Sequence, residues 1–140
     1  MFTHLLVAGD GSSPSLHAAR TAGDLARATK AAHVCIAVFQ HPVPSYLGAP
    51  QFDKVATSRV MEAEAVAKAM REEAGALPCD LDIEIVMAPP AEGIPTLCET
   101  HQADLVILGA GSFGPFTHLL LSEPVPRPGW PTPCPVLIVR

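Results

Sequence analysis

The residues in this sequence best suited to chemistry are three glycines that follow an apolar run. Residues 105–108 are continuously apolar, and Gly109, Gly111 and Gly114 come directly after them. Glycines permit positive φ and close approach of the backbone to a ligand, so the amides of such a turn can surround a phosphate. Pro115, a favoured first residue of a helix, follows the turn. The pattern favours an anion or phosphate cradle, although the same glycines would also suit a plain, tight strand-to-helix connection.

The spacing of these glycines, G-x-G-x-x-G, also matches the fingerprint of dinucleotide-binding enzymes. In those enzymes the turn lies in the first strand–helix–strand unit, and an acidic residue at the end of the next strand holds the ribose. Here the turn lies in the last unit, and residues 136–140 supply no such acid. A dinucleotide-binding enzyme is therefore the weaker alternative. The sequence has no G-x4-G-K-[S/T] loop, so it gives no support to a Walker-type NTPase.

Few other side chains are placed for chemistry. Asp10 is the one carboxylate expected at the crevice mouth; it can accept hydrogen bonds from a ribose or base, or cap its own G-D-G turn. The serines that follow it have no histidine that the sequence places nearby, so we assign no catalytic residue. Cys98 and His101 have i, i+3 spacing on one expected helix, but two ligands are weak evidence for a metal. We expect no metal site.

Composition indicates one globular domain over residues 1–140, because 49% of the residues are hydrophobic and only 16% are charged. The net charge of −5 and the lack of a Lys/Arg cluster argue against a nucleic-acid partner. The apolar runs are too short for a membrane span, and the opening residues do not resemble a signal peptide. The four cysteines form no C-x-x-C pair, which is typical of reduced thiols. We expect a cytoplasmic protein without membrane association.

Apolar runs alternate with segments of helical periodicity along the chain. Ser13 is the expected N-cap of the first helix. Residues 81–87 alternate between apolar and acidic side chains, which predicts an edge strand with one solvent-exposed face. Pro95 is expected to delay or kink the start of the third helix. The expected strands are 3–9, 33–39, 81–87, the run that ends at 109, and 134–140; the expected helices are 14–30, 52–74 and one that ends near 101. Residues 40–51 are expected to form an extended surface loop.

Strands that alternate with helices predict an α/β fold, a doubly wound parallel sheet of five strands. In such sheets, ligands bind beyond the carboxyl ends of the strands, where the strand order reverses. With the order 3-2-1-4-5, that point lies between the first and fourth strands. Ala8, Gly9 and Asp10 would line one side of the crevice, and residues 109–114 the other.

The sequence resembles the universal stress protein family over nearly the whole chain. The motifs that carry the resemblance are Asp10-Gly11-Ser12 after the first strand, Pro90-Ala91-Glu92, residues 103–109, the Leu119-Leu120-Leu121 run, and the ending at 133–140. The resemblance implies a Rossmann-like fold of the adenine-nucleotide-hydrolase type. It also implies a homodimer in which the final strands, here Val136 to Val139, pair across a two-fold axis.

Some members of that family bind ATP through G-x2-G-x9-G-[S/T], while the Asp after strand one contacts the nucleoside. The corresponding residues here are Gly109, Ser112, Ser122 and Glu123, and only Gly109 matches. Ser112 and Ser122 add a β-carbon where phosphate needs bare backbone, and a carboxylate about 4 Å from a phosphate is repelled by about 1 kcal/mol even in water. Prolines at 124–135 also replace the rest of the fourth helix.

The leading hypothesis is a non-enzymatic, dimeric binding or regulatory module with a vestigial or altered nucleotide crevice. The alternative is a protein that still binds ATP or AMP through the turn at 109–114, since the extra glycines at 111 and 114 and Asp10 remain. The nucleotide-binding candidates are Ala8, Gly9, Asp10, Val38, Leu108, Gly109, Gly111, Ser112, Gly114 and Ser122.

Overall fold

A computed structural model of the 140-residue chain describes residues 2–113 and 134–140. Its strands are β1 (His4–Gly9), β2 (His33–Phe39), β3 (Asp80–Val86), β4 (Leu105–Gly109) and β5 (Val136–Val139), and its helices are α1 (Ser13–Thr29), α2 (Ala49–Ala74) and α3 (Pro90–Thr100). All paired strands are parallel, and the sheet order is β3-β2-β1-β4-β5. The predicted fold class and the order 3-2-1-4-5 are confirmed.

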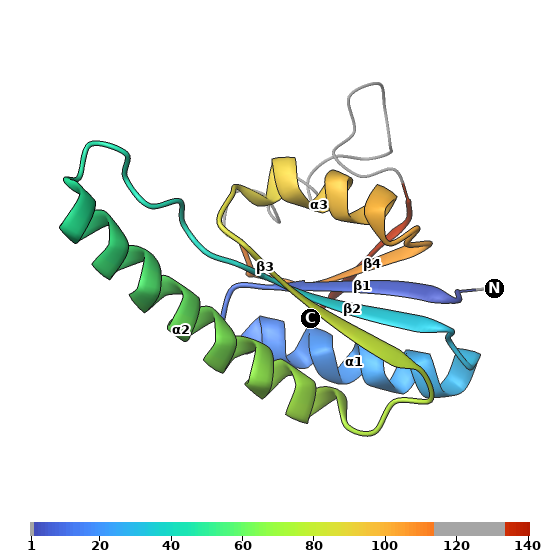
Figure 1. The fold of residues 1–140 in the computed structure, drawn as a ribbon. Helices are drawn as coiled ribbons and strands as arrows, with labels where there is room; N and C mark the ends of the chain where they lie inside the picture. Colours follow the sequence, from blue (N-terminus) through green and yellow to red (C-terminus); the bar gives the residue numbers. More distant parts are fainter. Residues whose placement is uncertain (1, 114–133) are drawn as a thin grey trace.

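The sheet is the middle of three layers (Figure 1), with α1 and α2 on one face and α3 on the other. β1 shows why its run is apolar throughout: Leu5 and Val7 join the core beneath α1 and α2, whereas Leu6 and Ala8 join the core beneath α3. Residues of β4 alternate in the same way. A strand covered on both faces needs apolar side chains at every position, which is the pattern that predicted a parallel sheet.

Helix α1 packs closely on the sheet through a face of small residues: Ala18, Ala19, Ala22, Gly23 and Ala26. The structure corrects its start, because the N-cap is Ser12 rather than Ser13. The Ser12 side chain makes no capping hydrogen bond to the helix. Its hydroxyl donates instead to Asp10 Oδ1 at 2.6 Å. The side chain that could cap the helix is therefore bonded to Asp10, a polar residue that precedes the helix.

Three other boundaries differ from the sequence predictions. α2 begins at Ala49 instead of 52, because Pro50 is tolerated in a first turn. α3 begins at Pro90, so Pro95 lies inside the helix and does not delay its start. On the edge strand β3 the expected alternation of wet and covered faces fails, since Ile83 is 41% exposed whereas Glu84 is partly buried. An edge strand lacks a neighbour on one side, which leaves an apolar side chain such as Ile83 open to water.

The predicted helix from Pro115 and most of the proline-rich segment at 124–135 lie outside the described residues. Within the described part, β5 is shorter than the predicted 134–140, because Cys134 and Pro135 precede its first paired residue. No helix among the described residues combines the length and apolar character needed to cross a bilayer.

Candidate functional site

The loop after β1 and the turn after β4 meet at the carboxyl edge of the sheet. Asp10 is the link: its Oδ2 accepts a hydrogen bond from Phe113 N at 2.9 Å, across 103 positions of sequence. Its Oδ1 accepts from Ser12 N at 3.0 Å, Ser12 Oγ at 2.6 Å and Ser15 Oγ at 2.9 Å. Both carboxylate oxygens therefore hold the protein's own groups together.

This network lowers the pKa of Asp10. Burial alone would raise the pKa, because it disfavours the charged form. The hydrogen bonds from Phe113 N, the hydroxyl and amide of Ser12, and the Ser15 hydroxyl outweigh that effect, so the net shift is downward. Asp10 is thus a carboxylate that its own loops keep ionised.

Ser112 faces into the protein rather than toward solvent. Its side chain is fully buried, and its hydroxyl lies 3.2 Å from Ser15 Oγ and 3.3 Å from Ser12 Oγ. Three hydroxyls and the Asp10 carboxylate thereby form a compact polar cluster between β1, α1 and the turn after β4. Ser112 is therefore part of this internal cluster.

Three amides of the turn after β4 already have partners within the protein. Ala110 N donates to Val139 O at 2.7 Å, Ser112 N donates to Gly109 O at 3.0 Å, and Phe113 N donates to Asp10. An amide that donates internally must give up that bond before it can bind a phosphate. Gly111, with φ of +91°, is the residue whose backbone requires glycine for its conformation.

A cavity of about 480 Å³ opens beside this turn, beyond the carboxyl ends of β1, β2 and β3. Its volume is within the range of small-molecule sites. Phe39 and Phe113 meet edge to face within its wall, with ring centroids 5.5 Å apart. Arg59 on α2 donates to the carbonyls of His41 and Pro42 and so braces the loop that follows β2. The lining residues are Asp10, Phe39, Gln40, His41, Pro42, Ala88, Pro89, Pro90 and Phe113.

Among the predicted nucleotide-binding residues that the structure describes, only Asp10 lines this cavity. Ala8, Val38 and Leu108 are fully buried in the core, and Gly9 packs against Met70. Gly109 ends β4, and Gly111 and Ser112 lie in the adjoining turn. The predicted Gly114 and Ser122 lie outside the described residues, as does Glu123.

Apart from Phe113, the lining residues outside the predicted set lie at the ends of β2 and β3 or shortly after them. The reversal of strand order predicts a crevice between the first and fourth strands, but there the Asp10–Phe113 hydrogen bond joins the two sides. The available signal was the position of residues 40–42 and 88–90 just after two parallel strands, because carboxyl ends of parallel strands share one edge of a sheet.

The Cys98 and His101 pair does not converge on one point. Cys98 is buried with its sulfur 3.7 Å from that of Cys134, and neither forms a disulfide. His101, the C-cap of α3, lies instead beside β3. The thiol contact raises the pKa of Cys98, as does its burial.

The whole chain resembles proteins of known family. Residues 1–140 match the Usp, or universal stress protein, family. A curated Thermus aquaticus protein, the universal stress protein in the QAH/OAS sulfhydrylase 3′ region, is 35% identical over 143 residues, which cover 100% of both chains.

Solved structures agree with this match. A universal stress protein in complex with cAMP is 26% identical, with a TM-score of 0.56 and coverage of 99% of this chain and 96% of that one. UspA from Lactobacillus plantarum has the same fold at 18% identity, with a TM-score of 0.71 and coverage of 99% and 98%. An Archaeoglobus fulgidus universal stress protein in complex with dAMP has it at 14% identity, with a TM-score of 0.58 and coverage of 100% and 98%. With the family match spanning every residue and a relative more than 30% identical over its full length, this chain belongs to the universal stress protein family.

Proposed function

We propose that this protein is a non-enzymatic binding module with an altered nucleotide crevice, which holds an adenine nucleotide by its nucleoside and gains little from its phosphates. The observation that carries the proposal is the Asp10–Phe113 hydrogen bond, which engages the turn internally while the cavity beside it stays open. The relative solved with cAMP supports an adenine nucleotide as the ligand class.

The chemistry of the cavity wall favours a nucleoside. Phe39 and Phe113 offer aromatic surface to a base, and base–aromatic stacking contributes about 1–3 kcal/mol. Gln40 carries an amide that both donates and accepts hydrogen bonds, as the edge of an adenine does. Among the described residues that line the cavity, none is Lys or Arg, the side chains that stabilise transferring phosphates. This lining supports binding without hydrolysis.

Calorimetric titration with adenosine, AMP and Mg-ATP tests the proposal. We expect adenosine to bind, and the three dissociation constants to agree within about threefold, which corresponds to less than 1 kcal/mol. Failure of adenosine to bind to the folded protein would contradict the proposal. So would Mg-ATP binding tenfold or more tightly than adenosine, because that gain would show that the turn holds phosphates.

A pair of aromatic variants locates the ligand. Phe113→Ala removes a ring from the cavity wall and should weaken adenosine binding about tenfold or more, whereas Tyr46→Ala, at a side chain 86% exposed and outside the lining, should leave it unchanged. Circular dichroism of both variants verifies the fold.

We also propose a homodimer through β5. Within the described residues β5 pairs only with β4, and its sequence Val-Leu-Ile-Val presents an apolar edge with Leu137 36% exposed. The open edge of such a strand readily pairs with a second copy of the chain.

The dimer is tested by substitution at both edges of the sheet. By sedimentation at micromolar concentration we expect a dimer for the unmodified chain and a monomer for Leu137→Lys. Ile83→Lys is the matched control: Ile83 is a 41% exposed apolar residue on the opposite edge strand, and its substitution should leave the dimer intact. A monomeric unmodified protein would refute the β5 interface.

We place the protein in the cytoplasm. None of its four cysteines forms a disulfide in the structure, which is typical of proteins in reducing compartments.

A further inference from the structure

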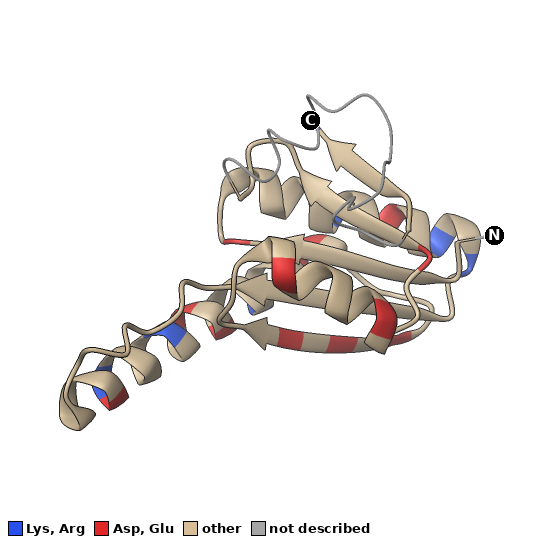
Figure 2. Cartoon of the chain, turned by 90° about the horizontal axis from the view of Figure 1, so that it is seen from above, with Lys and Arg blue, Asp and Glu red and all other residues tan. Residues whose placement is uncertain are grey.

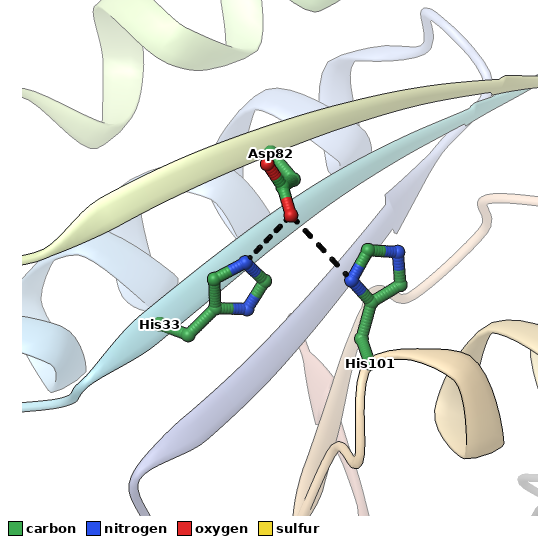
Figure 3. Close-up of side chains that lie close together, drawn as sticks. All are labelled: His33, Asp82 and His101. Atoms are coloured by element: carbon green, nitrogen blue, oxygen red, sulfur yellow. Dashed lines mark hydrogen bonds and ion pairs between the residues drawn. The ribbon is translucent and has the colours of Figure 1, made fainter.

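A cluster of His33, Asp82 and His101 lies at the amino end of the sheet, away from the cavity. His33 opens β2, Asp82 lies on β3, and His101 caps α3 at its C-terminus. Figure 3 shows the Asp82 carboxylate between the two imidazoles. His33 Nε2 is 2.9 Å and His101 Nδ1 is 3.7 Å from Asp82 Oδ2. We call these residues the histidine cluster.

The donor set and spacing of the histidine cluster suit a transition-metal ion. One ligand atom from each residue lies within 4.8 Å of the others. Donors about 2.0 Å from a tetrahedral ion lie about 3.3 Å apart, and the two distances to Asp82 fall on either side of that value. The imidazole rings are stacked at 12°, so both must turn for their lone pairs to meet, a rotation that the broad χ2 wells of histidine permit.

Glu84 supplies a second carboxylate, which lies where it can accept a hydrogen bond from a metal-binding histidine. Glu84 Oε1 lies 3.3 Å from His101 Nε2, the ring nitrogen opposite the one that faces Asp82. A ligating histidine almost always donates its other N–H to a carboxylate or carbonyl, which fixes the ring tautomer. Glu84 is thus positioned to orient His101 toward a shared ion.

The burial and the charge of the histidine cluster also favour a bound metal ion. The His33 and His101 side chains are only 18% and 11% exposed, whereas Asp82 is 57% exposed and leaves one side open to water. Figure 2 shows acidic residues along the edge strand β3. Among the described residues, neither Asp82 nor Glu84 has a Lys or Arg partner within 4.0 Å. A divalent ion would balance this charge.

We propose that the histidine cluster binds a divalent transition-metal ion of the zinc class. His33, Asp82 and His101 supply three ligands, water supplies the fourth, and Glu84 orients His101. Imidazole nitrogen with one carboxylate is a ligand set that zinc favours over magnesium or calcium. The ion would join the edge strand β3 to β2 and to the end of α3, and it is independent of the nucleoside cavity.

Cobalt(II) titration of untagged, chelator-treated protein tests this site, because Co²⁺ reports its ligands by visible absorption. We expect saturable binding of one ion per chain, a d–d spectrum without a thiolate charge-transfer band, displacement by Zn²⁺, and a higher Tm with Zn²⁺. A charge-transfer band would assign the ion to Cys98 and Cys134 and overturn the proposal. If Co²⁺ does not bind saturably, the three residues form an ion-pair cluster only, and the proposal is overturned as well.

Variants then identify the ligands. His33→Gln and Asp82→Asn should each weaken Co²⁺ binding at least tenfold, and Asp82→Asn keeps the shape of a side chain that is 57% exposed. Glu84→Gln should weaken it about 10- to 100-fold through His101. His17→Gln, at an exposed histidine on α1, is the control and should bind as the unmodified protein does. Unchanged affinity in both ligand variants would refute the site.

Discussion

Replacing Gly109 by alanine is expected to lower the free energy of unfolding by about 3 kcal/mol. A β-carbon at Gly109 would lie 2.2 Å from Pro14 O and 2.4 Å from Pro14 C. Both are backbone atoms in the first turn of α1, so no side chain can rotate away, and either the helix or β4 must move. Urea denaturation at neutral pH measures the loss of stability. An unchanged m-value would show that the loss does not come from a change in the compactness of the denatured state.

Gly48→Ala is the control for this variant. Gly48 precedes α2, and the nearest atom to an added β-carbon is the flexible end of Gln51, at 3.2 Å. Its substitution should cost about 1 kcal/mol or less, chiefly as a poorer N-cap. A Gly109→Ala variant no less stable than Gly48→Ala would contradict the close packing of α1 on β4. A large loss, by contrast, would show that the packing of α1 on β4 is sufficient to require glycine at this position.

The sheet could be predicted because each of its strands carries a local signal. The runs in β1 and β4 are apolar at every position, which only burial on both faces explains, and the small residues of α1 recur at helical spacing. The N-cap at Ser12 could not be predicted, because the choice between Ser12 and Ser13 depends on Asp10 and on contacts across the crevice. Residue type alone does not distinguish two adjacent serines.

The candidate site was less predictable, because its geometry depends on contacts distant in sequence. Asp10 lines the cavity, but its bond to Phe113 joins positions 103 apart. Ala8, Val38 and Leu108 were expected near a ligand because they lie near strand ends, yet helices cover both faces there and bury them completely. The cavity lies at the carboxyl ends of the strands, and the packing of the helices on the sheet determines which side chains reach it.

The histidine cluster illustrates the same limit. His33, Asp82 and His101 come from two strands and a helix terminus and share no local spacing. Parallel register places Asp82 opposite Cys35, two residues beyond His33 and on the same face, but only the packing of α3 brings His101 to them. The i, i+3 pair of Cys98 and His101 does not indicate this cluster, because the two side chains have different neighbours.

Asp10→Ala is expected to lower the free energy of unfolding by about 2–4 kcal/mol at neutral pH. The substitution removes the acceptor of four donors, Phe113 N, Ser12 N, and the Ser12 and Ser15 hydroxyls. Hydrogen bonds to a charged group contribute about 1.5–3 kcal/mol each, and water can reach part of this half-buried cluster, so the total is below their sum. Asp24→Ala, which removes an exposed carboxylate from α1, should change stability by about 0.5 kcal/mol or less.

The pH dependence separates loss of this charge from loss of packing. Folding lowers the pKa of Asp10, so its contribution is fully present above the unfolded-state pKa, ordinarily 3.8, and is lost as pH falls through the lower folded-state value. The stability difference between the unmodified protein and Asp10→Ala should therefore narrow as the solution is acidified below that value. Denaturant midpoints at a series of pH values measure it. If the stability difference stays constant at acidic pH, protonation of Asp10 does not reduce its contribution. Asp10 would then stabilise the fold by its shape rather than by its charge.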